Sequence, residues 1–251
     1  MGVGSPDAVA LTVTSVATPD VRARGARTRG RLPQVAGRAR LARVNAALRR
    51  ALERDERRFA RDDRWYEARC TTSHYGGTYE TLPTALVSAS SRVVSALVPV
   101  TACYPGGTDC EGWTSATVRV PSARRVRLRD LFRDPHAGLA ALQRSALARL
   151  NSADECATDA RDFVRDYPGE PDFALLPSGL AVGWTDFPAC AGRFMAAVPY
   201  SKLSSRFSPS GRRLIAGVRS PANAAALAQT QLAVDAYSAG PPMRPLLVRL
   251  R

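Results

Sequence analysis

The sequence contains very little histidine and lysine and no long apolar run, and each shortage excludes a class of protein. Among its 251 residues, His74 and His136 are the two histidines and Lys202 is the single lysine. Two histidines leave little room for a metal site or for a general base. The sequence has no run of about 18 apolar residues, so we expect no transmembrane segment within this chain.

Motifs for catalysis and for cofactors are missing as well. No cysteine pair has the CxxC spacing of structural zinc sites and thioredoxin-like enzymes. The glycine pairs in YPGGTD and HYGGTYE lack the lysine and the spacing of a phosphate-binding loop. A serine nucleophile would need His74 or His136 as its base, and both fall in segments with the composition of ordinary loops. We therefore expect no catalytic residue, no metal and no cofactor, and interpret the protein as non-enzymatic.

Arginine is what the chain has in excess. The formal net charge is +14, and the stretch from Arg22 to Arg64 holds fifteen arginines against five acidic residues, a difference of +10. A field this concentrated favours anionic partners such as nucleic acid, wall polymers or acidic lipid headgroups, unless it is simply a solvated helix and arm. The residues that we assign to an anionic partner are Arg22, Arg24, Arg27, Arg29, Arg31, Arg38 and Arg40.

The five cysteines are interpreted as partners in disulfides. Cys103 and Cys110 flank a Pro-Gly-Gly turn in TACYPGGTDC, between two segments with strand composition, which predicts a hairpin. A bridge across it would stabilise the fold by roughly 2.5 kcal/mol. Cys156 and Cys190 are the next pair, and Cys70 is left over. Because disulfides persist in oxidising compartments, this predicts a protein outside the cytoplasm; inert reduced thiols in a cytosolic protein are the alternative.

The hydrophobic periodicity predicts an α+β fold, with an antiparallel sheet packed with two to three amphipathic helices. Apolar residues at helical spacing predict a helix over residues 38–60, and further helices are expected over 138–150, 201–207 and 221–237. Strands are expected at 10–16, 65–70, 84–89, 93–100, 113–120 and 194–200, and on both sides of Pro177-Ser178-Gly179. An arginine-rich arm is expected between the first strand and residue 31.

Several short signatures, in a fixed order, resemble one known family. They are LPQVAGRARLARVNAAL, with Asn45 near the helix start, VVSALVPVTACYPGG, VRLRDLF, and DFALLPSGLAVGW with VPYSKL. The set is similar to the extracytoplasmic domain of unknown function shared by RsiV-type anti-sigma factors and the amino-terminal part of PdaC-type peptidoglycan deacetylases. The resemblance covers residues 31–207, with a strand and arm before it (1–30) and an alanine-rich helix and proline-rich tail after it (208–251).

One loop departs from this family. Its Gly-Gly-Ala-His sequence is matched here by Gly106 and Gly107, but Thr108 and Asp109 replace the alanine and the histidine. The chemistry of that loop therefore does not transfer to this chain.

The resemblance implies an exported, wall-facing binding domain without a catalytic site, and RsiV-type domains bind lysozyme. We expect an extracytoplasmic or secreted location, with the signal or anchor outside these 251 residues, and a cell-wall polymer or a lysozyme-like protein as partner. Lysozymes are usually basic, so the net charge of +14 would repel one unless it docked on an acidic patch. The candidate residues for that patch are Asp154, Glu155, Asp159 and Asp166. The alternative function is arginine-rich nucleic-acid binding, which would require reduced cysteines and a salt-dependent affinity.

Overall fold

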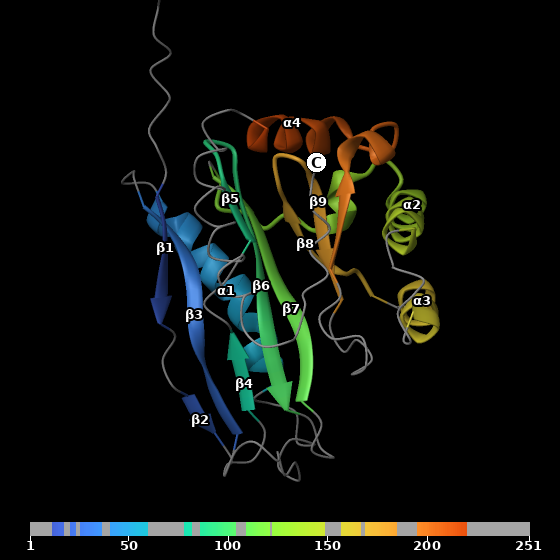
Figure 1. Cartoon of the computed structure of the whole chain (residues 1–251). Helices are drawn as coiled ribbons and strands as arrows, with labels where there is room; N and C mark the ends of the chain where they lie inside the picture. Colours follow the sequence, from blue (N-terminus) through green and yellow to red (C-terminus); the bar gives the residue numbers. More distant parts are fainter. Residues whose placement is uncertain are drawn as a thin grey trace, which may run out of the picture.

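The structure is a computed structural model that describes residues 12–17, 21–23, 26–36, 41–59, 78–81, 86–103, 109–120, 122–148, 157–166, 169–184 and 195–219. Within these ranges the chain forms a seven-stranded sheet, a three-stranded sheet and four α-helices (Figure 1). The predicted α+β class is confirmed. The strands expected at 65–70 and the helix expected at 221–237 lie outside the described residues.

The larger sheet runs in the order β1-β3-β4-β6-β5, with β2 paired to β3 and β7 paired to β6. Its strands are β1 (Thr12–Ala17), β2 (Val21–Ala23), β3 (Ala26–Ala36), β4 (Thr78–Thr81), β5 (Leu86–Ala89), β6 (Val93–Cys103) and β7 (Asp109–Arg119). The strand pairs of this sheet are antiparallel as expected, except that β3 and β4 pair in parallel. Parallel neighbours need a long crossover connection, and a helix lies between these two strands in the chain.

The amino-terminal segment of the described chain is built from strands. The first strand is confirmed as β1. The expected arginine-rich arm is instead built into the sheet, because β2 and β3 pair with each other and β3 also pairs with β1 along six residues. The described part of this segment is therefore strand.

Helix α1 (Leu41–Phe59) confirms the predicted amphipathic helix. Its inner positions Leu41, Val44, Leu48 and Leu52 are buried against the larger sheet. Asn45 fixes its start: the side-chain oxygen accepts from the Val35 amide at 3.0 Å, and the side-chain amide donates to the Val35 carbonyl at 2.8 Å. One side chain thereby completes the hydrogen bonds of both backbone groups of a residue near the end of β3.

Strand β6 is buried on both of its faces. Val94, Ala96 and Val98 pack in the core under α1, while the alternate residues face the smaller sheet, with Ser95 bonded to β8 and Leu97 in a small cluster with that sheet. Alternate residues of a strand point to opposite faces, which explains why the sequence VVSALVPV is apolar almost throughout. The molecule has three layers here: α1, the larger sheet, and the smaller sheet (Figure 1).

The hairpin predicted around the cysteine turn is confirmed. Strands β6 and β7 pair antiparallel from Val93↔Arg119 to Cys103↔Asp109. The structure describes the backbone of Cys103 and Cys110, in neighbouring register positions, but not their side chains. The disulfide between them stays a prediction.

The smaller sheet has the order β10-β9-β8, with β8 (Asp172–Leu175), β9 (Gly179–Gly183) and β10 (Met195–Pro199). These are the three strands predicted around and after Pro177-Ser178-Gly179. Three helical elements precede this sheet in the chain and two follow it. They are η2 (Leu128–Leu131), α2 (Pro135–Leu147) and α3 (Ala157–Asp166), then η4 (Tyr200–Leu203) and α4 (Pro209–Val218). Helices α3 and α4 were not predicted, and the short helix expected over 201–207 is the 3₁₀ turn η4.

Helix α2 corresponds to the helix predicted from residue 138, but it begins earlier. Asp134 is its N-cap, with a side-chain oxygen that accepts from the Ala137 amide at 3.0 Å, and Pro135 occupies the first turn. This N-cap carboxylate and the following proline are standard start signals. Leu142 and Ala146 are buried as expected.

Hydroxyl groups join the two sheets along the outer edge of β8. The Leu175 amide donates to Ser95 Oγ at 2.8 Å, and Ser88 Oγ donates to the Leu175 carbonyl. Ser115 Oγ donates to a carboxylate oxygen of Asp172 at 2.7 Å. A buried backbone group without a partner would cost stability, so these side chains let a sheet edge be buried inside the molecule.

Candidate functional site

A groove of about 530 Å³ lies between helix α4 and the turn that joins β8 to β9. Pro177, Pro199, Ile215 and Ala216 supply apolar surface, and Arg212 and Arg219 lie along the helix side. The remaining lining residues are Ser178, Tyr200, Ser201, Ser204 and Phe207. The groove is therefore apolar, with hydroxyl groups and two arginines and with no acidic side chain in its lining.

Helix α4 is held in place at its first turn. Ser208 is the N-cap, with Oγ 3.0 Å from the Gly211 amide that it accepts from, and it also donates to the Asp130 carbonyl at 3.2 Å. Gly211 lies so close to Leu131 that an added Cβ would overlap the Leu131 carbonyl. The lack of a side chain at Gly211 thus allows α4 to pack directly on η2.

The side of α4 that faces the groove carries three residues at helical spacing. Arg212, Ala216 and Arg219 are four and three residues apart, which places them on one face, and all three are exposed. The opposite side buries Leu214 and Val218. Arg219 is the C-cap of α4, seven positions after Arg212, and at the helical rise the two backbone positions lie about 10 Å apart along the axis.

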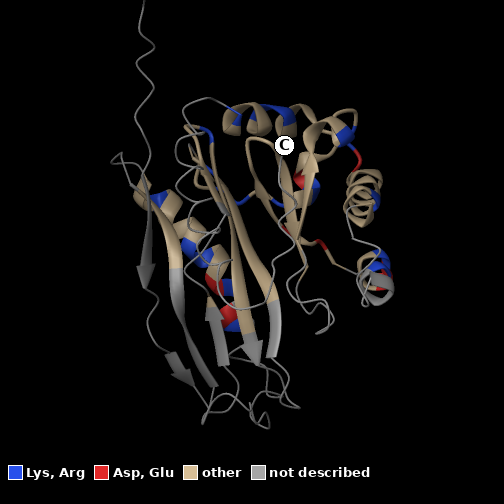
Figure 2. Cartoon of the chain, viewed as in Figure 1, with Lys and Arg blue, Asp and Glu red and all other residues tan. Residues whose placement is uncertain are grey.

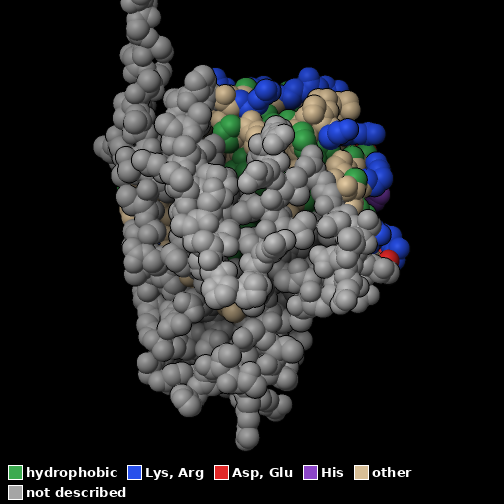
Figure 3. All heavy atoms as spheres, in the orientation of Figure 1, with side chains coloured by type: hydrophobic (Ala, Val, Ile, Leu, Met, Phe, Trp, Pro, Cys, Tyr) green, Lys and Arg blue, Asp and Glu red, His purple; other side chains and the backbone are tan. Residues whose placement is uncertain are grey.

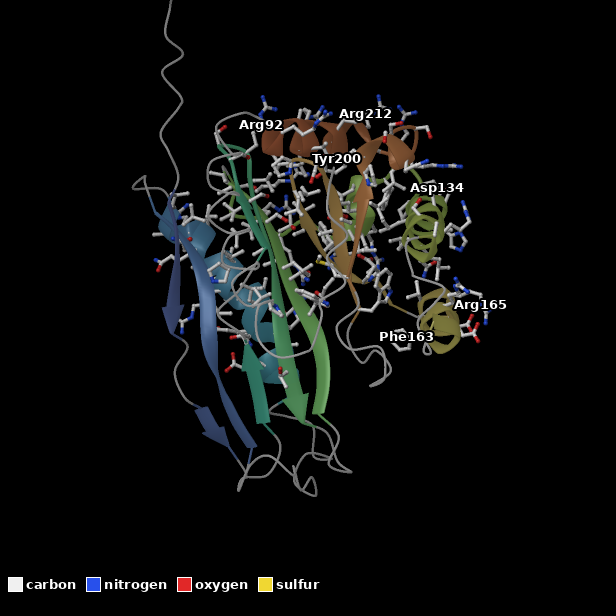
Figure 4. All side chains as sticks on the ribbon, viewed as in Figure 1. Arg92, Asp134, Phe163, Arg165, Tyr200 and Arg212 are labelled. Carbon is white, nitrogen blue, oxygen red and sulfur yellow. The ribbon has the colours of Figure 1, made fainter. Side chains whose placement is uncertain are left out.

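Further basic side chains surround this stripe. We define the α4 basic face as the exposed residues Arg92, Lys202, Arg206, Arg212, Arg213 and Arg219. Arg92 belongs to it because its Cβ would lie 3.2 Å from a Cβ added at Gly217 of α4. Blue ribbon segments mark basic residues along α4 in Figure 2, blue side chains gather there in Figure 3, and Figure 4 labels Arg92 and Arg212 on this helix side. Within the described part of the chain, none of the six forms an ion pair.

Tyr200 forms part of the groove floor beneath α4 (Figure 4). Its hydroxyl donates to the Leu176 carbonyl at 2.7 Å. Burial raises the pKa of this phenol well above its usual range, because the phenolate would lose its hydration. Tyr200 therefore stays neutral and positions the floor, and it offers no proton transfer near neutral pH.

The residues that line the groove can bind a ligand, but they include no candidate general base. No histidine or carboxylate lines it, and Ser204 Oγ donates to the Ser201 carbonyl at 3.1 Å instead of facing a base. His136 is exposed in the first turn of α2. Among the residues that the structure describes, no cluster of three histidine, cysteine, aspartate or glutamate side chains could hold a metal ion.

Most of the residues singled out in the sequence are not described in full. Arg22, Arg27, Arg29 and Arg31 lie in β2 and β3, and Asp109 begins β7, but only their backbones are described. Outside the described residues lie Arg24, Arg38, Arg40, Gly106, Gly107, Thr108, Cys70, Cys156, Cys190, His74, Asp154 and Glu155. The predicted anionic-partner residues, family loop and second disulfide stay predictions.

The candidate acidic patch is partly helical. Asp159 and Asp166 belong to α3, and the side chain of Asp166 forms two hydrogen bonds of 3.0 Å with Arg165. This hydrogen bond to Arg165 holds the pKa of the Asp166 carboxyl below its usual value. Glu170 forms an ion pair with Arg129. Asp166 and Glu170 are thus each paired with an arginine, which leaves less negative charge for a basic partner.

The groove was missed in the sequence because its parts come from separate segments. The sequence SPSGRRLIAGVR contains a local signal for helix α4: a Ser-Pro start followed by Leu214, Ile215 and Val218 at helical spacing. The β8–β9 turn and η4 meet this helix through tertiary packing, which no local spacing reports.

In the part of the chain that the structure describes, no helix has both the length and the apolarity needed to cross a membrane. No protein-family model and no curated protein matches the sequence.

The solved structures that are similar to this chain include two DUF3298 family proteins. A DUF3298 family protein from Pseudomonas aeruginosa has 14% sequence identity and a TM-score of 0.46, over 83% of this chain and 97% of that one. A DUF3298 family member from Bacteroides fragilis has 12% identity and a TM-score of 0.52, over 85% of this chain and 99% of that one. At these identities the likeness concerns the fold. The fold of this chain is thus similar to that of the DUF3298 protein from Bacteroides fragilis, in agreement with the family resemblance of the sequence.

Proposed function

We propose that this protein is an exported, non-enzymatic binding domain of the cell envelope that holds an anionic wall polymer on the α4 basic face. The observation that carries the proposal is the set of six exposed cations without an ion-pair partner among the described residues, beside an apolar groove that contains no acid. Uncompensated basic surface attracts and concentrates polyanions.

The family resemblance supports the location. The RsiV-type and PdaC-type domains that the sequence resembles face the cell wall, and the fold is similar to that of a DUF3298 protein. A Cys103–Cys110 bridge would suit an oxidising compartment. The groove offers hydroxyl, guanidinium and apolar surface, which suits binding.

A lysozyme-like protein is the less supported partner. Lysozymes are usually basic, and the net charge of +14 opposes their approach. Of the acidic residues that could offset this charge, Asp166 and Glu170 are engaged by Arg165 and Arg129. Lysozyme therefore serves as a comparison ligand in the test.

The experiment is co-sedimentation of the full chain with Gram-positive sacculi that carry their phosphodiester-linked polymer, and with the same sacculi stripped of it by acid. We expect binding to the intact sacculi, weak binding to the stripped ones, and a steep loss as salt rises, because polyanion binding releases counterions. Equal binding to both preparations would contradict the proposal.

Competition identifies the partner class. Lysozyme and a duplex DNA of random sequence are added separately at the same ionic strength. We expect neither to displace the protein from sacculi at concentrations equivalent to the polymer. Stronger binding to the DNA would replace the proposal with the nucleic-acid function, and tight binding to lysozyme would replace it with a lysozyme-sensing role.

A further inference from the structure

We propose that the groove beside α4 takes a single strand of a linear polyanion laid along the helix, with Arg212 and Arg219 each holding one anionic group. This inference rests on the proposed function and assigns the site and the geometry of binding. It requires a ligand with two anionic groups about 10 Å apart and an uncharged stretch between them.

The spacing of the arginines carries the geometry. Both line the groove from the same side of α4, and Ala216 lies between them on that side. Because Ala216 has the smallest side chain that L residues offer, a strand can pass over the helix surface from one guanidinium to the other. A guanidinium binds phosphate or carboxylate through paired N–H donors, so each arginine suits one anionic group.

The floor suits the uncharged part of such a strand. Pro177, Pro199 and Ile215 supply apolar surface that can contact the carbon face of a glycerol or sugar unit. The structure beneath the floor is closely packed: a Cβ added at Gly179 would lie 2.6 Å from the Val198 carbonyl oxygen, and the Tyr200 hydroxyl donates to the Leu176 carbonyl. A preformed floor lowers the ordering cost of binding.

The neighbouring residue provides a matched control. Arg213 is exposed on the same helix, one position from Arg212, but it does not line the groove. Removal of either charge changes the net charge equally. A contact spread over the α4 basic face would weaken similarly in both variants, whereas a strand in the groove depends on Arg212 more than on Arg213.

The test titrates the full chain with fluorescent poly(glycerol phosphate) at about 0.15 M ionic strength. Oligogalacturonate in parallel distinguishes carboxylate from phosphate as the preferred anion. We expect Arg212→Gln and Arg219→Gln each to weaken binding about tenfold and Arg213→Gln less than about threefold. A fragment too short to span both arginines should bind more weakly than a longer one and lose less than it on either single arginine substitution, because the other arginine still holds its anionic group.

A second variant blocks the groove without changing any charge. Ala216 is exposed, so Ala216→Phe should leave the fold intact, which the thermal melting curve checks. We expect it to weaken binding about tenfold or more. If the three arginine variants lose affinity equally and Ala216→Phe binds like the wild type, the polymer does not lie in the groove. The proposed function would then still stand. Failure of the wild type to bind either polymer would overturn both.

Discussion

Helices α1 and α4 are both amphipathic and arginine-rich, but their charges are arranged differently. On α1, Arg49 and Arg57 both form ion pairs with Glu53 one turn away. Helix α4 contains Arg212 and Arg213 and no acidic residue. Figure 2 shows red residues beside the blue ones on α1 and only blue ones on α4.

The difference shows that the number of arginines in a segment is a poor guide to a polyanion site. Exposed ion pairs add little stability. The carboxylate of each pair nevertheless offsets the positive charge that its arginine presents to a polyanion. The stretch from Arg22 to Arg64 contains most of the net charge, yet α1 within it is partly self-compensated. The α4 end contributes fewer charges, and in the described residues they are uncompensated.

The largest expected effect comes from removing a buried leucine, which should destabilise the protein in either helix but weaken polymer binding in α4 alone. Leu48 of α1 and Leu214 of α4 are both buried, so Leu48→Ala and Leu214→Ala should each lower the free energy of unfolding by about 2–5 kcal/mol. Urea unfolding measures this change. Among the folded molecules, polymer binding should fall only for Leu214→Ala; an equal fall for Leu48→Ala would break the comparison.

The hydroxyl contacts between the two sheets should give the next largest effect. Ser95 accepts from the Leu175 amide and bonds Thr117 Oγ1 at 2.6 Å. Ser95→Ala leaves a buried amide without its partner and should cost about 1–3 kcal/mol, whereas Ser91→Ala, at an exposed position, should cost almost nothing. Urea unfolding followed by two probes, one on each sheet, should stay a single transition in the wild type. Two separate transitions would show that the α1 and α4 halves are independent.

The smallest expected effect concerns α3, which shares the charge arrangement of α1. Arg165 is paired with Asp162 and Asp166 (Figure 4 labels Arg165). Since the pKa of Asp166 is lowered in the folded state, its contribution is present above the ordinary aspartate pKa and is lost as the pH falls through the lowered value. Carbon-detected NMR should show the Asp166 carboxyl titrating below its usual pKa, and Arg165→Gln should move it back up. If the Asp166 pKa is the same in Arg165→Gln and in the wild type, the ion pair on α3 does not compensate charge in the way proposed for α1.

The sequence predicted elements whose signal is local and periodic. Helix α1 and the pairing of β6 with β7 are confirmed, and both had a signal within a single segment: a repeating apolar face and a Pro-Gly-Gly sequence between two strand-like runs. Helix α4 was missed because Pro209 and Gly211 are usually turn residues, and their roles here depend on the Ser208 cap and on close packing against Leu131.

The groove could not be predicted because it is a product of tertiary structure. The turn at Pro177, the 3₁₀ turn at Tyr200 and helix α4 are separated in the chain and meet in space. The parallel pairing of β3 and β4 was missed for the same reason, since the pairing partner of a strand is not encoded in its own periodicity.

The central claim is that uncompensated charge on α4, and not the number of arginines, selects the polyanion. The most direct measurement compares two charge-matched double variants in binding to sacculi that carry the anionic polymer. Arg212→Gln with Arg219→Gln removes two exposed charges from the α4 basic face, and Arg49→Gln with Arg57→Gln removes two ion-paired charges from α1. We predict that the α4 variant loses binding by about a hundredfold while the α1 variant changes it by less than about threefold. Equal losses, or a larger loss in the α1 variant, would contradict the account.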